Sequence, residues 1–259
     1  MSEGHSQGPL LTLDRGNSAL KADVWEGNTA VETVVMPPAC IHRQLPSLLM
    51  RHPIVGAISC SVTDGGERVA HVFEDAGIPF WNFSTDSDIP LVIDYASPTT
   101  LGVDRVAGCI GAMTLYPGRE LLVVDLGTAI TYDRVSATGH FVGGNIAPGV
   151  SLRLKALNAF TARLPKVELS GAVPTWGYDT DTALRSGSIL GIAAEVEYYR
   201  SLMPPAAKVI LTGGSAPRIL PYLSSGYVLE PRLVPIGLKA CLSNFLKQSK
   251  KTLHLHEIA

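Results

Sequence analysis

One short pattern that could bind phosphate groups occurs twice in this chain of 259 residues. An apolar run ends in Asp14-Arg15-Gly16-Asn17-Ser18, and a second ends in Asp125-Leu126-Gly127-Thr128. A further strand-like run follows each glycine, which predicts two β-hairpins. Glycine has no Cβ, so backbone N–H groups at such a turn can approach a ligand closely, beside the aspartate carboxylate. One copy alone would also fit an ordinary turn. We interpret two copies, facing each other, as a site for a polyphosphate and its metal ion.

Two further segments fit this interpretation. Lys21 lies on the returning strand of the first hairpin, where its ammonium can offer a point charge to a phosphate. Gly213 and Gly214 join a short apolar strand to a helix, although many strand-to-helix turns need glycine for their own geometry. After two Asp-x-Gly hairpins, we interpret this pair as a contact to the base or ribose of a nucleotide, near a helix N-terminus.

The densest polar stretch runs from Tyr95 to Arg105. Gly102 frees the backbone, and Asp104 stands where a helix is predicted to begin. A structural role is available, because aspartate is a preferred N-cap residue. The functional alternative is a carboxylate base at Asp104, with the Arg105 cation beside it to hold a substrate carboxylate. Within the whole pattern we favour the functional interpretation.

The elements that must position these residues follow a similar order in each half of the chain. We expect an N-terminal subdomain over residues 10–117 and a C-terminal one over 118–248, with a flexible tail at 1–9 and a polar, frayed tail at 249–259. Alternating strands and helices predict an α/β fold with a mixed sheet. Duplication predicts two similar subdomains with a cleft between them, a favoured place for ligands. The expected elements are hairpins at 10–25 and 121–135, further strands at 30–35, 55–62 and 208–211, helices at 44–51, 67–76, 104–115, 150–161, 182–202 and 237–247, and a glycine-rich turn at 143–149.

Composition narrows the class of protein. Hydrophobic residues make up 46% and charged residues 17%, as in an ordered globular protein. The net charge of −2 gives no electrostatic reason to expect nucleic acid or acidic membranes as partners. No apolar run approaches the roughly 20 residues of a membrane span, and the polar first eight residues do not resemble a signal peptide. Four scattered cysteines and the absence of metal-ligand spacings among the histidines predict free thiols, no zinc site and a cytoplasmic location.

Taken together, the motifs resemble the type III pantothenate kinase family, within the superfamily of acetate and sugar kinases, Hsp70 and actin. The resemblance covers residues 10–246. It implies an actin-like ATPase fold of two duplicated ribonuclease H-like subdomains with a nucleotide cleft between them. The motifs that carry it are Asp14-Arg15-Gly16-Asn17-Ser18 with Lys21, Tyr95-x-x-Pro98-x-x-Leu101-Gly102-x-Asp104-Arg105, Asp125-Leu126-Gly127-Thr128-Ala129, Gly143-Gly144-x-Ile146-x-Pro148-Gly149, and Thr180 with Ser186-Gly187.

The resemblance also implies an activity, the ATP-dependent phosphorylation of pantothenate that begins coenzyme A synthesis. Asp104 would be the general base, Asp14 would serve Mg²⁺, and Asp125 would bind K⁺ or NH₄⁺. Thr180 would reach the pantothenate pocket from the second subunit of a homodimer. The remaining implied contacts are Gly16, Asn17, Ser18, Lys21, Gly127, Thr128, Gly213 and Gly214 to the nucleotide, and Tyr95, Gly102, Val103 and Arg105 to pantothenate.

Other functions remain open at this point. A non-catalytic regulator resembling the Bvg accessory factor would be expected to lose catalytic residues and to carry a basic patch. An actin-like assembly protein would be longer and would lack the stretch from Tyr95 to Arg105. A kinase for another small hydroxy acid is the alternative that the sequence separates least well. Two departures from the family pattern are Arg15 and the pair Tyr178-Asp179.

Overall fold

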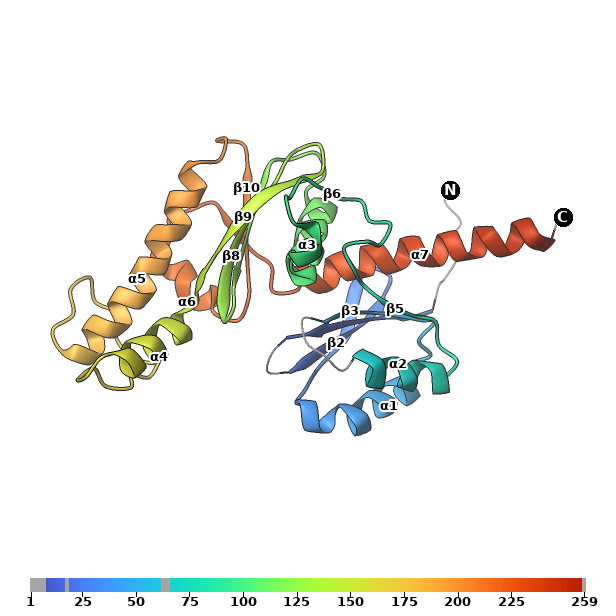
Figure 1. Ribbon diagram of the computed structural model, residues 1–259, viewed down its shortest axis with the longest axis horizontal. Helices are drawn as coiled ribbons and strands as arrows, with labels where there is room; N and C mark the ends of the chain where they lie inside the picture. The colour runs from blue at the N-terminus through green and yellow to red at the C-terminus, as the bar shows by residue number, and fades with distance from the viewer. Residues whose placement is uncertain (1–7, 17–18, 62–65, 258–259) are drawn as a thin grey trace. The chain divides into compact units, whose positions relative to one another are not determined.

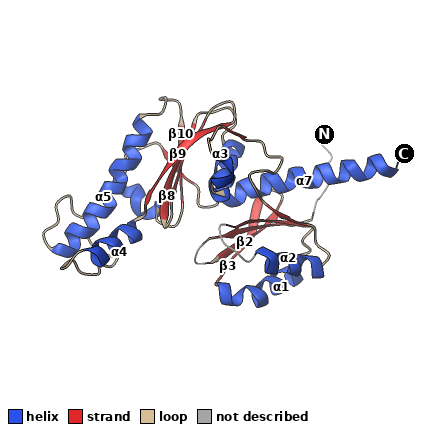
Figure 2. Cartoon of the chain, viewed as in Figure 1, coloured by secondary structure: helices blue, strands red, loops and turns tan. Residues whose placement is uncertain are grey.

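The computed structural model describes residues 8–16, 19–61 and 66–257, and the chain folds into two compact units. Unit 1 comprises Met1–Val92, Ala96–Leu115 and Leu233–Ala259, and unit 2 comprises Ile93–Tyr95 and Tyr116–Arg232. Each unit contains a mixed sheet with helices packed against it, as Figure 2 shows by colour. The predicted α/β class is therefore correct.

The sheet of unit 1 has the order β3-β2-β1-β4-β5 among the described residues. Its first three strands form an antiparallel meander, and the last two run parallel to β1. The predicted first hairpin and third strand are confirmed, although Asn17 and Ser18 of the hairpin turn lie outside the described residues. The strands are β1 (Leu10–Arg15), β2 (Leu20–Glu26), β3 (Thr29–Met36), β4 (Gly56–Ser61) and β5 (Phe80–Asn82).

The two faces of this sheet have different chemistry because side chains alternate along a strand. Leu11 and Leu13 of β1 and Leu20 of β2 enter an apolar core with helices α1 (Ile41–Arg51) and α2 (Gly66–Asp75). Figure 1 shows both helices on that face of the sheet. The opposite face of β1 and β2 therefore carries the polar set Thr12, Asp14, Lys21 and Asp23.

Helix α1 begins earlier than the sequence predicts. A short 3-10 helix, Pro38–Cys40, leads directly into Ile41. Pro46, which would fall in the first turn of the helix predicted at 44–51, therefore lies inside α1. Burial of Leu45 and Leu48 against the sheet offsets the hydrogen bond that the proline cannot donate.

Helices α3 (Val103–Leu115) and α7 (Leu233–Glu257) pack closely in unit 1 because glycine stands where they meet. A Cβ on Gly237 would overlap the carbonyl oxygen of Ala107, and one on Gly111 would overlap that of Leu233. This packing places α7 in unit 1, whereas the sequence-based boundary puts it in the second half. The helix also continues past Ser249, where a frayed tail is predicted, since residues 238–257 contain no glycine or proline.

The sheet of unit 2 repeats the topology of unit 1. Its order is β11-β10-β7-β8-β9-β6, in which β7, β8 and β9 are antiparallel and β10 and β11 run parallel to β7. The predicted second hairpin is confirmed. The strands are β6 (Val92–Ile93), β7 (Leu121–Leu126), β8 (Ala129–Val135), β9 (His140–Pro148), β10 (Lys208–Thr212) and β11 (Tyr227–Leu229).

The glycine-rich segment at 143–149 is mostly strand, so its prediction as a turn was wrong. It belongs to β9, which pairs with β8 as far as Pro148. The register shifts between Arg134 and Val135, and Gly143 adopts a φ of 134° beside that irregularity. Glycine accommodates this backbone without strain, which allows the strand to continue.

Three helices cover one face of the second sheet: α4 (Val150–Phe160), α5 (Thr180–Ser201) and α6 (Ala216–Ile219). Figure 1 shows them on the same side of β8 and β9. Val124, Val150 and Ile189 are among the buried residues of this core. Two more 3-10 helices, Pro98–Thr100 and Leu220–Tyr222, complete the elements. Among the described residues, no helix is long and apolar enough to cross a membrane.

Candidate functional site

The carboxylate of Asp14 lies at the end of β1, in a row with two other reactive side chains. Asp14 pairs with Lys21 of β2 on one side and with Cys60 of β4 on the other. Burial raises the pKa of Asp14 from 3.8 to about 6, with further raising by the Asp104 and Asp23 carboxylates and lowering by the Lys21 ammonium. Unit 1 therefore brings together three predicted site residues, namely Asp14, Lys21 and Asp104.

Asp104 occupies the first turn of α3, one residue inside the helix. Its Oδ1 accepts a hydrogen bond from the Arg105 backbone N–H at 2.9 Å, so the carboxylate is oriented by the helix that carries it. A Cβ on Gly102 would lie 2.5 Å from that same oxygen. Gly102 therefore leaves room for the Asp104 carboxylate, while the Arg105 side chain is buried at 8% exposure.

Cys60 is a neighbour of this carboxylate pair that no motif in the sequence singles out. Burial raises the pKa of its thiol well above the usual value, and the Asp14 and Asp104 carboxylates raise it further. The Cys60 thiol is therefore an uncharged, buried group beside Asp14. Pairing of β4 with β1 is the signal that could have found it. Cys40, Cys60, Cys109 and Cys241 are thiols rather than disulfides, as predicted.

In unit 2, the second Asp-x-Gly turn lies against the Gly-Gly turn that follows β10. A Cβ on Gly213 would overlap Asp125 Oδ1, and Gly213 has a φ of 87°, a conformation suited to glycine. The Ser215 backbone N–H donates to the Leu126 carbonyl at 2.9 Å. The structure thus brings Asp125, Gly127, Thr128 and Gly213 into one region, beside Gly214, whose Cβ position is open.

Gly149 adds to this region, although its sequence motif does not indicate a contact for it. Its backbone N–H donates to the Thr128 carbonyl at 2.9 Å. A Cβ on Gly149 would overlap the Gly127 carbonyl oxygen. The start of α4 is therefore fixed directly beside the hairpin turn, which holds the turn in place.

Tyr95 and its neighbour Asp94 are held in unit 2 by contacts to the start of β9. The Tyr95 ring meets the Phe141 ring edge-on, with centroids 5.7 Å apart. The Asp94 backbone N–H donates to the Phe141 carbonyl at 3.1 Å, and His140 Nδ1 lies 2.7 Å from Asp94 Oδ2. Of the other predicted pantothenate contacts, Gly102, Val103, Asp104 and Arg105 belong to unit 1, and Thr180 belongs to unit 2.

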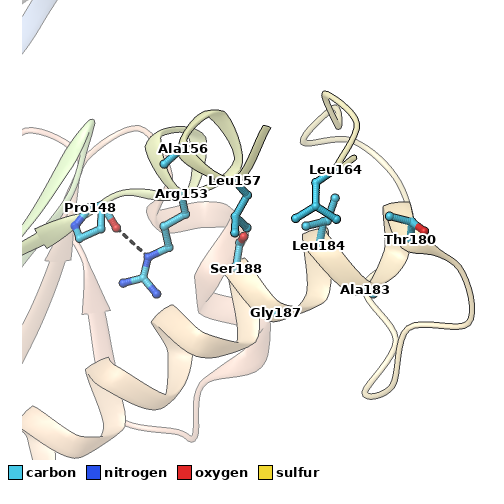
Figure 3. Close-up of a pocket in the computed structure, with 10 residues that line it drawn as sticks. All are labelled: Pro148, Arg153, Ala156, Leu157, Leu164, Thr180, Ala183, Leu184, Gly187 and Ser188. Atoms are coloured by element: carbon cyan, nitrogen blue, oxygen red, sulfur yellow. Dashed lines mark hydrogen bonds between the residues drawn. The ribbon is translucent and has the colours of Figure 1, made fainter. Parts of the chain in front are cut away.

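Thr180 is the first residue of α5 and lines a groove of about 620 Å³ between α4 and α5. Figure 3 shows Thr180 at one end of this groove and Pro148 at the other, with leucine and alanine side chains between them. The Arg153 guanidinium donates to the Pro148 carbonyl and to Glu195. Asp179, a departure from the family pattern, has a structural role, because it caps α5 by accepting from the Thr182 backbone N–H at 2.8 Å.

The donor atoms available for metal binding are few. Within the described residues, no group of three or more His, Cys, Asp or Glu side chains is arranged to hold a metal ion. Mg²⁺ in phosphate sites commonly uses only one or two carboxylates, with phosphate oxygens and water as the other ligands. A single carboxylate at Asp14 therefore suits a metal that arrives with a nucleotide.

Comparison with known proteins gives a consistent result for sequence and structure. Residues 10–201 match the family described as type III pantothenate kinase. Curated proteins of that name from Porphyromonas gingivalis (strain W83) and Phocaeicola vulgatus are 39% and 36% identical, and each alignment covers 90% of this chain and 97% of the relative.

Solved structures show the fold alone. A Campylobacter jejuni protein described as a Baf family transcriptional activator has a TM-score of 0.62 at 21% identity, covering 92% of this chain and 99% of the other. An activator of 2-hydroxyisocaproyl-CoA dehydratase from Clostridium difficile, with bound ADPNP, has a TM-score of 0.52 at 12% identity, covering 94% and 97%. The fold is the actin-like ATPase fold with its duplicated units, as the sequence predicts.

Proposed function

Because this chain belongs to the type III pantothenate kinase family, we propose that its Asp-x-Gly hairpins and the start of α3 carry the chemistry of that family. The reaction is the ATP-dependent phosphorylation of pantothenate, the first step of coenzyme A biosynthesis. The observation that supports these residue assignments best lies in unit 1. There the charges of the Asp104 carboxylate and the Lys21 ammonium both act on the Asp14 carboxylate. The proposed base (Asp104), metal ligand (Asp14) and phosphate-binding cation (Lys21) are therefore neighbours.

The first hairpin would bind the phosphates. Asp14 would hold Mg²⁺, which when bound neutralises charge on the transferring phosphoryl group. Residues Gly16, Asn17 and Ser18 of the turn and the Lys21 ammonium would contact phosphate oxygens. Phosphoryl transfer depends mainly on positioning and electrostatic stabilisation, which these groups can supply.

The start of α3 would act on the acceptor. As the pantothenate hydroxyl oxygen bonds to the γ-phosphorus, its proton would pass to the Asp104 carboxylate and ADP would leave. The hydrogen bond from the Arg105 N–H to Oδ1 leaves Oδ2 as the natural acceptor of that proton. Arg105, Tyr95, Gly102 and Val103 would hold the rest of pantothenate.

The second hairpin and the Gly-Gly turn would complete nucleotide binding. Gly127, Thr128, Gly213 and Gly214 would contact the nucleotide, and Asp125 would bind K⁺ or NH₄⁺. Contact between Gly213 and the Asp125 carboxylate supports a shared site, because any larger residue at 213 would collide with that carboxylate.

A coupled assay for ADP release tests the activity and the monovalent cation together. We expect turnover with pantothenate, ATP and Mg²⁺, higher in K⁺ or NH₄⁺ than in Na⁺, and no K⁺ activation in the Asp125→Asn variant. Omitting pantothenate is the matched control. Equal turnover in all three salts would exclude the cation role of Asp125 but would leave the kinase function in place. A folded protein that is inactive in every salt would contradict the kinase function itself.

We also propose a homodimer in which Thr180 contributes to the partner's pantothenate pocket. The surface near Thr180 supports this, because large aromatic side chains are exposed at the end of α4 and before α5. Phe160 is 89% exposed, Trp176 87% and Tyr178 74%. Exposed apolar surface of this kind, next to an apolar groove, is typical of a protein interface.

Charge placed on this surface is expected to separate the subunits. We expect Trp176→Glu to sediment as a monomer at micromolar concentration and to have a higher KM for pantothenate, because burying an unpaired carboxylate opposes association. Met50→Glu is the matched control, since Met50 is also exposed, at 82%, but lies on α1 of unit 1. A dimeric Trp176→Glu protein with an unchanged KM would contradict this interface.

A further inference from the structure

Asp23 on β2 has a buried carboxylate that the proposed reaction does not use. The side chain has no exposed surface. Thr33 Oγ1 donates to Oδ1 at 2.5 Å, whereas Oδ2 has no hydrogen-bond partner in the described part of the chain. A buried carboxylate is costly unless a cation or further hydrogen bonds offset its charge. A cation on the same face of the sheet would supply that compensation.

The strand register places Lys21 in that position. Leu20, Ala22 and Val24 enter the core beneath α1 and α2, so Lys21 and Asp23 share the opposite face of β2. Residues two apart on a strand are separated by about 6.6 Å, which the four-carbon stem of a lysine can span.

Asp14 completes the row on the neighbouring strand. It pairs directly with Lys21, and Asp23 pairs with Thr12 one step further along that face, so Lys21 lies between two carboxylates. The charges of Lys21 and Asp23 both act on the Asp14 carboxylate, the first lowering and the second raising its pKa. The three groups therefore share one electrostatic environment.

We infer that Asp23 is a positioning residue for Lys21: its buried carboxylate attracts the Lys21 ammonium and orders this side chain on the Asp14 face before a phosphate binds. Immobilising a lysine side chain on a phosphate costs conformational entropy. A lysine that is already ordered loses less entropy and therefore binds phosphate more tightly. This inference rests on the proposed function, in which Lys21 contacts the nucleotide phosphates.

The second hairpin supplies a natural control. Asp133 stands on β8 where Asp23 stands on β2, and it is also fully buried. At the position that corresponds to Lys21, however, this hairpin has Thr131. A buried aspartate occurs at both places, but only the first can act on a lysine of its own strand.

A double-mutant cycle with Asp23→Asn and Lys21→Met tests the inference. Asparagine keeps the shape of the side chain and can still accept from Thr33, but it has no charge. We expect Lys21→Met to raise the KM for ATP about tenfold, as for loss of a charge-assisted hydrogen bond. Asp23→Asn should raise it about fivefold in the wild-type background but less than about twofold in the Lys21→Met background. The KM for pantothenate should stay unchanged.

The outcomes separate this inference from the proposed function. If Asp23→Asn raises the KM for ATP by the same factor in the wild-type and the Lys21→Met backgrounds, Asp23 acts on the fold and not through Lys21, and the inference is wrong. If Lys21→Met leaves the KM for ATP unchanged, the proposed role of Lys21 fails instead. Asp133→Asn should change the KM for ATP by the same factor in the wild-type and the Lys21→Met backgrounds. Should Asp23→Asn not fold, Asp23→Ser removes the same charge and enters the same cycle.

Discussion

The Asp104→Asn variant is expected to lose turnover by about 100- to 10,000-fold, the usual contribution of a general base. The carboxamide cannot take the hydroxyl proton, so transfer to phosphorus loses its acceptor. Its oxygen can still accept from the Arg105 backbone N–H, which bonds to Asp104 Oδ1 at 2.9 Å. The start of α3 should therefore be preserved, and the loss should appear in kcat with little change in the KM for ATP.

Steady-state kinetics at saturating Mg²⁺ measures this change. Asp75→Asn, an exposed aspartate at the end of α2, is the matched control and should retain full activity. Equal unfolding temperatures for the two variants would exclude a folding defect. Turnover near the wild-type value would remove Asp104 as the base and would favour a mechanism in which positioning of the hydroxyl alone suffices.

Local patterns in the sequence predict the hairpins well, because strand period and turn glycine are local properties. Leu10–Arg15 with Leu20–Glu26 and Leu121–Leu126 with Ala129–Val135 are both found close to their predicted bounds. The internal repeat also indicates duplicated units. In these two hairpins the local sequence determines the secondary structure, and tertiary contacts do not change it.

Long-range packing accounts for what the sequence did not reveal. The glycines of β9 look like a turn in sequence, but pairing with β8 makes them a strand. Helix α7 follows the second half in the chain, yet the close approach at Gly237 joins it to α3 of unit 1. Similarly, only the register of three strands places Cys60 and Asp23 around Asp14.

A second large effect is expected from Asp14→Asn, which should stabilise the ligand-free protein while removing its activity. Burial and the Asp104 carboxylate raise the pKa of Asp14 from 3.8 to about 6. Ionising this side chain therefore costs the folded state up to about 3 kcal/mol relative to the unfolded chain. Asparagine avoids that cost but is a poor ligand for Mg²⁺, so kcat/KM should fall at least about 100-fold.

The sign of the pH dependence follows from the raised pKa. Protons bind the folded state more tightly, so the stabilising contribution of protonated Asp14 is complete below pH 3.8 and is lost as the pH rises through about 6. Without nucleotide or Mg²⁺, the unfolding temperature of Asp14→Asn should therefore exceed that of the wild type more at pH 8 than at pH 5. About 3 kcal/mol corresponds to roughly 6–12 °C for a protein of this size.

Differential scanning calorimetry at the two pH values decides this prediction, with Asp75→Asn as the control that should follow the wild type. Adding Mg²⁺ and ATP should raise the unfolding temperature of the wild type more than that of Asp14→Asn, because the variant keeps the other proposed nucleotide contacts but lacks the carboxylate that would bind Mg²⁺. A variant less stable than the wild type at pH 8 would mean that Lys21 already compensates the Asp14 charge. The stability gain and the activity loss have one physical cause. The ionised Asp14 carboxylate that would bind the metal destabilises the folded protein as long as no cation neutralises its charge.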